Sequence, residues 1–234
     1  MRAMGLKLLR QSPLLRSLPS SRLRQVMRFA HRRAFAAGDT IFNKRDLAQH
    51  MFIVASGRVK IYTRSGLRKT KTFAYLGSGD FFGEMALLDA RERSASAVAS
   101  APSELIVIHK RDFKRFLLAD SDLCFNLLRA LSDRLRKANE QIESLLFQNI
   151  LGRVARTLCE LARRDPERGK TGVTIRHPYT QRELAELVGT TREPLARALG
   201  VLRRGRFIEL RDGRILIRSA QKLESLSTAP LGVE

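Results

Sequence analysis

A segment with two glycines followed by an arginine holds residue types that can bind an anion. The run Gly79-Asp80-Phe81-Phe82-Gly83-Glu84-Met85-Ala86-Leu87-Leu88 leads to Arg93-Ser94-Ala95-Ser96. A glycine before a short helical stretch lets the backbone approach a phosphate at the helix N-terminus, and Arg93 can bind the anion from the other side. Glu84 can accept a hydrogen bond from a sugar hydroxyl. The alternative is that Glu84 and Arg93 form only an ion pair and hold no ligand.

A second group of polar residues shares one face of a predicted helix that follows Thr191. Thr191 as N-cap places Pro194 in the first helical turn, where a proline removes no hydrogen bond. Arg192, Glu193 and Arg197 then share one face, and the opposite face is apolar, with Leu195, Ala198, Leu199 and Leu202. Arginine can donate two hydrogen bonds to guanine and a carboxylate can accept one from cytosine, so the polar face suits the DNA major groove. The alternative is an ordinary amphipathic helix with its charges in solvent.

The segments around this helix predict a winged helix-turn-helix. The preceding helix has an apolar face formed by Leu184, Ala185, Leu187 and Val188, and Gly189 can end it in a left-handed conformation. After the second helix, Arg211-Asp212-Gly213 separates the short runs Phe207 to Leu210 and Arg214 to Ile217, which indicates a hairpin. Arginines near it can contact phosphates: Arg203, Arg204, Arg206, Arg211 and Arg214.

The part of the chain that holds the first glycine segment has the pattern of a small antiparallel roll. Between Phe35 and Lys110 the chain has short runs rich in Val, Ile, Phe and Tyr, and glycines separate several of them. The runs are residues 40–42, 51–55, 58–63, 73–76, 95–99 and 105–109. Apolar residues at helical spacing from Leu14 to Arg33 predict a helical lead before the roll.

A long helix is expected to connect the two parts. After Asp112 the apolar period is helical to about Arg164, with a break near Asn149 to Gly152. Within it, a stripe alternates steps of three and four residues: Leu128, Leu131, Leu135, Ala138, Ile142 and Leu145. Such a stripe is the seam of a two-stranded coiled coil, so we expect a homodimer. The fold class is α+β, with a β-roll at 14–120, a dimerisation helix at 121–148 and a winged helix-turn-helix at 149–220.

Composition limits the class of protein. The 234 residues carry a formal charge of +21, which favours a polyanionic partner, nucleic acid first and an anionic membrane surface second. The two cysteines, Cys124 and Cys159, form no CxxC pair, so neither a disulfide framework nor a cysteine metal cluster is expected. Without a signal peptide or an apolar stretch of roughly 20 residues, we expect a cytoplasmic protein that spans no membrane.

The chain resembles the CRP/FNR family of bacterial transcription regulators, and residues 79–96 resemble its cyclic-nucleotide-binding phosphate cassette. The cassette combines Gly83-Glu84, Ala86-Leu87 and Arg93-Ser94-Ala95. The likeness includes Ser56-Gly57-Arg58-Val59, Tyr75-Leu76 with Gly79-Asp80, the long helix, and Thr191-Arg192-Glu193 with Arg197. It runs from about Leu14 to Arg218, nearly the whole chain.

The resemblance implies roles for individual residues. Glu84 would hold the ribose 2′-hydroxyl, Arg93 and Ser94 the cyclic phosphate, and Gly83 would leave room for it. We also assign to the ligand site Met85, Ala86, Ala95 and Arg134. Arg192, Glu193 and Arg197 would read a palindromic site with half-sites similar to TGTGA, and we add to the DNA site Thr180, Arg182 and Thr191. RNA polymerase is a further candidate partner.

One departure from the family concerns the base of the nucleotide. The cyclic-AMP-responsive members have a Thr-Ser pair on the dimer helix, where this chain has Ala138-Asn139. Asn139 offers both a donor and an acceptor, so a purine can still be read, guanine rather than adenine. The alternative is that Ala138 only packs in the seam and Asn139 is an exposed helix residue. The resemblance therefore implies cyclic AMP or cyclic GMP as the ligand.

Other functions fit less well. The iron-sulfur branch of the family needs an N-terminal group of cysteines, and this chain has no cysteine before Cys124. The haem branch needs an axial histidine, and the four histidines show no ligand pairing: His31, His50, His109 and His177. We therefore expect no metal, haem or iron-sulfur cluster, and the absence of a P-loop, an HExxH and a GxSxG motif argues against an enzyme. A regulatory module of an enzyme or channel would need a further domain. Two alternatives remain: a regulator independent of nucleotide, and one gated by another ligand such as a cyclic dinucleotide.

Overall fold

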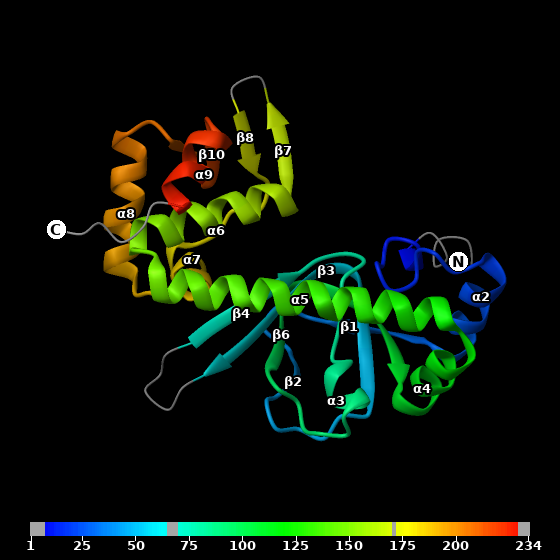
Figure 1. Ribbon diagram of the computed structural model, residues 1–234. Coiled ribbons are helices and arrows are strands. Elements are labelled where there is room, and N and C mark those ends of the chain that lie inside the picture. Colours follow the sequence, from blue (N-terminus) through cyan, green and yellow to red (C-terminus); the bar gives the residue numbers. More distant parts are fainter. Residues whose placement is uncertain (1–7, 65–69, 170–171, 229–234) are drawn as a thin grey trace. The chain divides into compact units, whose positions relative to one another are not determined.

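The computed structural model of the chain describes residues 8–64, 70–169 and 172–228. The chain forms two compact units, residues 1–135 and 136–234. The division falls inside one long helix, α5 (Ser121–Phe147) (Figure 1). The predicted α+β class is confirmed, with an antiparallel roll in the first unit and a helix-turn-helix in the second.

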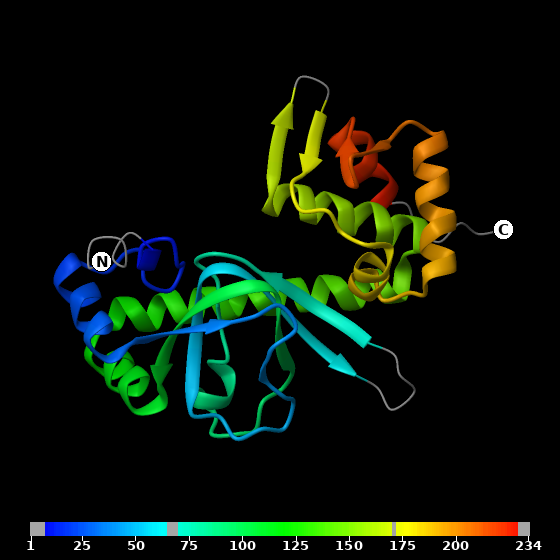
Figure 2. The same cartoon turned by 180° about the vertical axis from the view of Figure 1, so that it is seen from behind.

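The first unit is built on a six-stranded antiparallel sheet. Its strands are β1 (His31–Phe35), β2 (Thr40–Phe42), β3 (His50–Arg64), β4 (Thr70–Leu76), β5 (Phe81–Phe82) and β6 (Ser96–His109). The order is β1-β6-β3-β4, while β2 pairs with β6 and β5 pairs with β3. The ribbon of β3 and β4 is plain in the view from behind (Figure 2).

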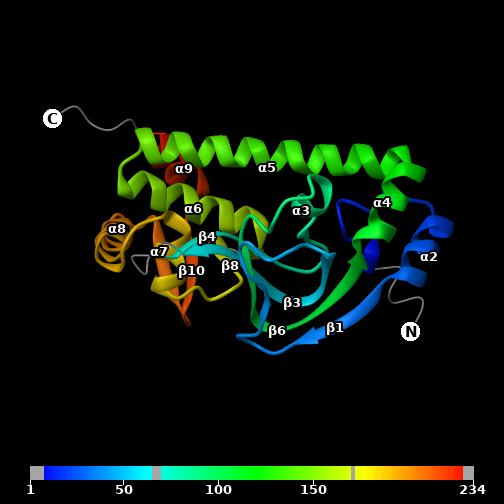
Figure 3. The ribbon, with the colours of Figure 1, turned by 90° about the horizontal axis from the view of Figure 1, so that it is seen from below.

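The two long strands separate two apolar clusters. On β3, Met51 and Ile53 pack with residues of the helices, whereas Phe52 and Val54 point into the roll. This alternation follows from the two-residue period of a strand. The helices of this unit are α2 (Ser20–Phe29), α3 (Met85–Leu88), α4 (Lys110–Ala119) and the first part of α5. Figures 1 and 3 show α2 and α4 at the same end of the roll. Within the cassette, Phe81 packs in the first apolar cluster and Phe82 in the second.

Two details of the first unit differ from the sequence prediction. The helical lead ends at Phe29, and residues 31–35 form β1 against β6. The runs 51–55 and 58–63 are one strand, because Gly57 forms a bulge with φ +86° instead of a turn. The register shifts on both sides of Gly57, and a Cβ there would lie 2.2 Å from the Pro102 carbonyl oxygen. A glycine in a strand pattern can thus mark close backbone approach within a continuous ladder.

The second unit contains the predicted winged helix-turn-helix. After the end of α5 come α6 (Ile150–Arg164), β7 (Pro166–Gly169), β8 (Gly172–Ile175), α7 (Gln181–Val188), α8 (Arg192–Arg204), β9 (Ile208–Arg211), β10 (Arg214–Ile217) and α9 (Ala220–Thr228). The four strands pair in the order β7-β8-β10-β9. The predicted break between the long helices is confirmed, because the Asn149 side chain accepts a hydrogen bond from the Gly152 N–H and caps α6.

Buried apolar residues from every helix of this motif form one core. Leu195 and Leu202 of α8 are fully buried and pack with Leu158 of α6 and Leu184 of α7. The face of α8 predicted to be apolar is therefore the face that packs, which leaves its charged face outside. The sequence did not predict β7 or α9. Strand β7 lies in a stretch rich in turn residues, and α9 follows the hairpin.

Candidate functional site

Arg93 is buried within the cassette, at 5% exposure. Its Nη1 donates a hydrogen bond to the Gly83 carbonyl at 2.5 Å, and its Nη2 donates one to the His50 carbonyl at 2.6 Å. The guanidinium carbon lies 4.2 Å from the centre of the Phe42 ring. Burial lowers the pKa of Arg93, and the nearby Glu84 carboxylate partly offsets this. Arg93 is therefore a cation fixed by backbone carbonyls and an aromatic face rather than by an acidic partner.

Glu84 is the other buried charge of the cassette, at 1% exposure. Its Oε1 accepts a hydrogen bond from Nη1 of Arg134, and Nη2 of Arg134 donates to the Phe81 carbonyl at 2.5 Å. Burial raises the pKa of Glu84, although the charge of Arg134 opposes this. The direct ion pair between Glu84 and Arg93 is wrong, because Arg134 of α5 is the ion-pair partner of Glu84. That the cassette holds a ligand stays a prediction.

Each of these two side chains retains one buried polar atom that is not satisfied. Among the described residues, neither Oε2 of Glu84 nor Nε of Arg93 has a hydrogen-bond partner. A buried acceptor and a buried donor of this kind are costly unless a bound group completes them. Gly83, between the two segments, has φ +80°, and a Cβ there would lie 2.7 Å from Nη1 of Arg93. The residues present thus fit a ligand that carries both a hydroxyl and an anionic group.

The other predicted ligand residues are distributed unevenly. Met85 is exposed, Ala86 is buried, Ser94 is exposed and Ala95 is half-buried. Their assignment to the ligand stays a prediction. Ala138 and Asn139 are exposed on α5, but they belong to the second unit. Their assignment to the base of a nucleotide also stays a prediction.

Sequence reasoning missed the aromatic and carbonyl groups that surround Arg93. Phe42 on β2 and the His50 carbonyl on β3 reach the guanidinium from strands distant in sequence. No local motif marks them, since only the pairing of the strands brings them together. The His50 ring also packs edge-on against His109, with centroids 5.2 Å apart, and burial and that neighbour lower the pKa of His50. Within the described chain, no group of three or more His, Cys, Asp and Glu is arranged to hold a metal ion.

The helix-turn-helix has the turn geometry expected from its sequence. Gly189 ends α7 with φ +79°, and Thr191 is the N-cap of α8. The Thr191 side chain, however, accepts no capping hydrogen bond from the described helix. Thr180 forms a capping box with Glu183 at the start of α7, so its hydroxyl is already engaged. Arg182 pairs with Glu186 at 3.3 Å.

The outer face of α8 presents three charged residues to solvent. Arg192, Glu193 and Arg197 are exposed, and within the described chain their side chains form no hydrogen bond or ion pair. Their donors and acceptors are thus available to base edges. Long charged side chains that are not engaged within the protein are what a helix needs to read the major groove.

The hairpin after α8 has the geometry of a wing. Asp212 and Gly213 have φ +49° and +73°, as a tight hairpin turn of type I′ requires. Arg211 pairs with Glu209 at 2.8 Å and Arg214 with Glu167 at 2.9 Å, so these two arginines are partly neutralised. The other three arginines proposed for phosphate contact are exposed: Arg203, Arg204 and Arg206.

Helix α5 has two different apolar faces. Leu123 and Leu127 are buried against the roll. Leu128, Leu135, Ile142 and Leu145 of the predicted seam are exposed. Leu135, for example, is 63% exposed. The helix thus carries an apolar stripe that this chain does not cover within its described residues. No described helix has the length and apolar character needed to cross a membrane.

Known proteins resemble the chain over most of its length. The family model of the cyclic nucleotide-binding domain matches residues 32–120, and that of the Crp-like helix-turn-helix domain matches residues 152–226. The chain is 34% identical over 216 residues to the cyclic AMP receptor protein of Thermus thermophilus, a match that covers 92% of this chain and 97% of that protein. It is 30% identical over 200 residues to the cAMP-activated global transcriptional regulator Vfr of Pseudomonas aeruginosa, with 83% and 92% covered.

A solved structure extends the likeness to the fold. The structure of FixK2 from Bradyrhizobium japonicum matches with a TM-score of 0.76 at 21% identity. The match covers 86% of this chain and 98% of that one. At this identity the comparison shows a common fold.

Proposed function

Because the chain belongs to the CRP/FNR family of transcription regulators, we propose that it is a homodimer that binds specific DNA more tightly when the cassette holds a cyclic nucleotide. The family resemblance seen in the sequence is confirmed. One observation carries the ligand part of the proposal: Glu84 and Arg93 are buried, and among the described residues Oε2 of the one and Nε of the other have no partner.

The cassette residues divide the work of holding the ligand. Arg93 uses two of its five donors on the Gly83 and His50 carbonyls, so others remain for the oxygens of a phosphate. Ser94 is exposed beside it and can add a hydroxyl. Glu84 can accept from the ribose 2′-hydroxyl through Oε2 while Oε1 stays with Arg134. Met85, Ala86 and Ala95 would line the same site.

Ala138 and Asn139 of α5 concern the choice of base. Asn139 can donate and accept, which favours a purine read through both kinds of group, and we propose cyclic GMP or cyclic AMP as ligand. The replacement of the Thr-Ser pair by Ala138-Asn139 also supports the alternatives: another ligand such as a cyclic dinucleotide, or activity without a nucleotide.

The exposed stripe of α5 supports the proposed homodimer. Exposed leucines and an isoleucine at coiled-coil spacing are typical of a helix that packs against a second helix. A second copy of the same helix supplies the matching stripe, and a two-fold dimer presents two copies of α8 to a palindromic DNA site. In this dimer Arg192, Glu193 and Arg197 would read each half-site, with Thr180, Arg182 and Thr191 beside them.

Further parts of the proposal follow from the class of protein. We propose that the regulator works in the cytoplasm, on double-stranded DNA, with RNA polymerase as a partner and without membrane attachment. We expect no catalytic turnover of nucleotides, and no metal, haem or iron-sulfur cluster in the protein. Incubation with cyclic AMP and cyclic GMP should leave both nucleotides intact.

Equilibrium dialysis tests the ligand site directly. Wild-type protein should retain labelled cyclic AMP or cyclic GMP, and Arg93→Ala should lose that retention because the anion loses its buried cation. Arg91→Ala is the matched control: Arg91 lies two residues away, and its exposed side chain pairs with Asp89 and with no other described residue. Equal retention by the wild type and Arg93→Ala would overturn the assignment of the cassette. Binding of cyclic di-GMP in place of either mononucleotide would select the alternative ligand.

A further inference from the structure

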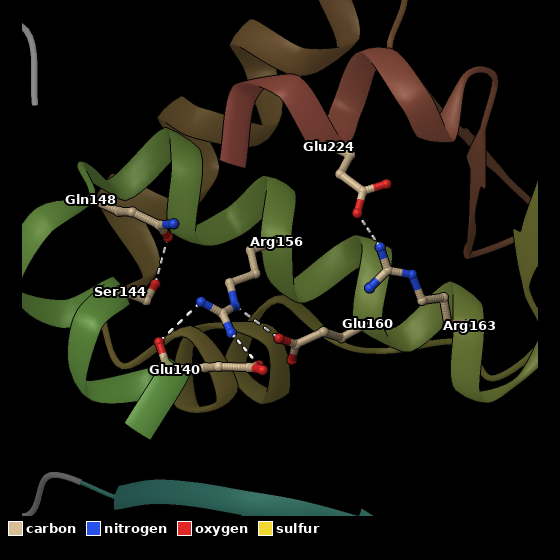
Figure 4. A network of polar contacts seen from close by, with 7 residues as sticks. All are labelled: Glu140, Ser144, Gln148, Arg156, Glu160, Arg163 and Glu224. Atoms are coloured by element: carbon tan, nitrogen blue, oxygen red, sulfur yellow. Dashed lines mark hydrogen bonds and ion pairs between the residues drawn. The ribbon is translucent and has the colours of Figure 1, made fainter. Parts of the chain in front are cut away.

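The last turns of α5 are tied to α6 by one arginine. Arg156 on α6 donates from Nη1 to the Glu140 carbonyl at 3.0 Å and from Nη2 to Oε2 of Glu140 at 2.6 Å. Its Nε donates to Oε1 of Glu160 at 2.9 Å, one turn further along α6. Figure 4 shows the guanidinium between the two acidic residues. All three nitrogens of the Arg156 side chain therefore donate hydrogen bonds, two to Glu140 on α5 and one to Glu160 on α6.

The side chain of Arg156 is less exposed than that of Arg163, which forms an ion pair from the same helix. The Arg156 side chain is 20% exposed, whereas that of Arg163, which pairs with Glu224 of α9, is 63% exposed. An exposed pair contributes little, because solvent screens it and both side chains stay mobile. A planar guanidinium that bridges a carboxylate and a backbone carbonyl has a defined geometry that a lysine cannot reproduce.

The segment between α5 and α6 is short and specifically held. Ser144 is buried and donates from Oγ to Oε1 of Gln148 at 2.6 Å (Figure 4). Asn149 then caps α6 through the Gly152 N–H at 2.9 Å. The hydrogen bonds between Arg156 of α6 and Glu140 of α5 join the two helices on either side of this short segment. The end of α5 is thus joined to α6 both through the chain and across the bend.

A second arginine ties α6 to the turn before the recognition helix. Nη2 of Arg153 donates to the Val188 carbonyl at 2.9 Å and to the Gly189 carbonyl at 2.8 Å. These carbonyls end α7, and α8 begins three residues after Gly189. Burial lowers the pKa of Arg153. With the shared core of α6 and α8, this contact makes α6 and the helix-turn-helix one packed body.

We propose that Arg156 is a positioning residue for DNA recognition, which holds the end of α5 on α6 so that a change in α5 moves α8. The inference rests on the proposed function, in which α5 forms the dimer and α8 reads DNA. Glu140 directly follows Asn139, the residue assigned to the base of the nucleotide. A ligand that moves Asn139 therefore also moves the residue that Arg156 binds.

The test compares two arginine variants of the same helix. Arg156→Met keeps an unbranched side chain close in length to the aliphatic part of arginine and removes its three donor nitrogens. Arg163→Met does the same to the exposed pair with Glu224. Affinity for a labelled operator is measured with and without saturating nucleotide, and nucleotide binding is measured separately. For Arg156→Met we expect the gain in DNA affinity caused by nucleotide to fall by about fivefold or more, within the usual range of allosteric coupling. Nucleotide should still bind, and Arg163→Met should behave as wild type.

Several outcomes overturn the inference. A full gain in Arg156→Met, or an equal loss in Arg163→Met, would show that the Arg156 contacts do not position α8. If nucleotide does not change DNA binding by the wild type, the proposed gating is wrong. The role of Arg156 is then judged by affinity for the operator, and Arg156→Met must still bind it more weakly than Arg163→Met. Glu140→Gln, which retains the carbonyl contact, serves if Arg156→Met does not fold and should show a smaller loss in the same assays.

Discussion

Replacement of Glu84 by glutamine separates the role of the cassette in binding from its role in stability. Glutamine has nearly the same shape, and its carbonyl oxygen can still accept the hydrogen bond from Arg134 on α5. The amide nitrogen replaces Oε2, the atom that has no partner among the described residues. That position can then donate a hydrogen bond but cannot accept one, and it carries no charge.

The expected loss of ligand affinity follows from the burial of Glu84. At 1% exposure the carboxylate is not screened by solvent, so a hydrogen bond to it counts as one to a charged group. Such bonds contribute about 1.5–3 kcal/mol. At about 1.4 kcal/mol for each tenfold, Glu84→Gln should weaken cyclic nucleotide binding by roughly 10- to 150-fold.

The same substitution should stabilise the protein without ligand at neutral pH. Burial raises the pKa of Glu84 in the folded state, so the folded protein holds this proton more tightly than the unfolded chain. The contribution of the tightly held Glu84 proton to the free energy of unfolding is complete below the ordinary pKa of a glutamate. It is lost as pH rises through the raised pKa of Glu84 in the folded protein. Glu84→Gln removes this loss, so its melting temperature should exceed that of wild type at neutral pH, and the two should converge in acid.

Calorimetric titration with cyclic AMP and cyclic GMP, together with thermal unfolding from acid to neutral pH, measures both effects. Glu104→Gln is the control, because Glu104 forms an exposed ion pair with Arg32 on the same sheet. It should bind nucleotide as wild type does. Wild-type affinity in Glu84→Gln would refute the role of Oε2. A lower melting temperature across the whole pH range would refute the sign of the pKa argument.

Three further predictions concern backbone, dimer and base. Gly83→Ala should lower the free energy of unfolding by about 1–3 kcal/mol, because alanine is strained at φ +80° and its Cβ meets Arg93; thermal unfolding measures this. Leu135→Asp should convert the dimer to a monomer in analytical ultracentrifugation, because a carboxylate would enter the seam, whereas Lys137→Asp, outside the seam, should stay dimeric. Ala138→Thr combined with Asn139→Ser restores the Thr-Ser pair and should shift the preference towards cyclic AMP in competition dialysis; an unchanged preference would remove Asn139 from the site.

Local patterns predicted those parts of the fold that depend on neighbours in sequence. The break before α6 needed only Asn149, and the wing needed only Asp212-Gly213, because caps and tight turns are local structures. Gly57 shows the limit of such signals. A glycine serves equally in a turn or a bulge, and only its close approach from β3 to the Pro102 carbonyl on β6 decides between them.

The sequence indicated the two charged residues of the candidate site, Glu84 and Arg93, but not the partner of Glu84. The sequence singled out Glu84 and Arg93, but it offered a direct ion pair between them as one alternative. The partner of Glu84 is Arg134, 50 residues away on α5. Such a contact is set by how the helix packs on the roll, so spacing within the cassette carries no information about it.

A titration of a labelled palindrome with TGTGA half-sites tests the central claim most directly. It is run without nucleotide, with cyclic AMP and with cyclic GMP, at one near-physiological salt concentration, because a chain of charge +21 also binds DNA without specificity. One nucleotide should tighten specific binding by about tenfold or more, within the range of allosteric coupling, and Arg93→Ala should lose that response. Equal affinity under all three conditions would contradict gating by a cyclic nucleotide and leave a DNA-binding regulator with a different input.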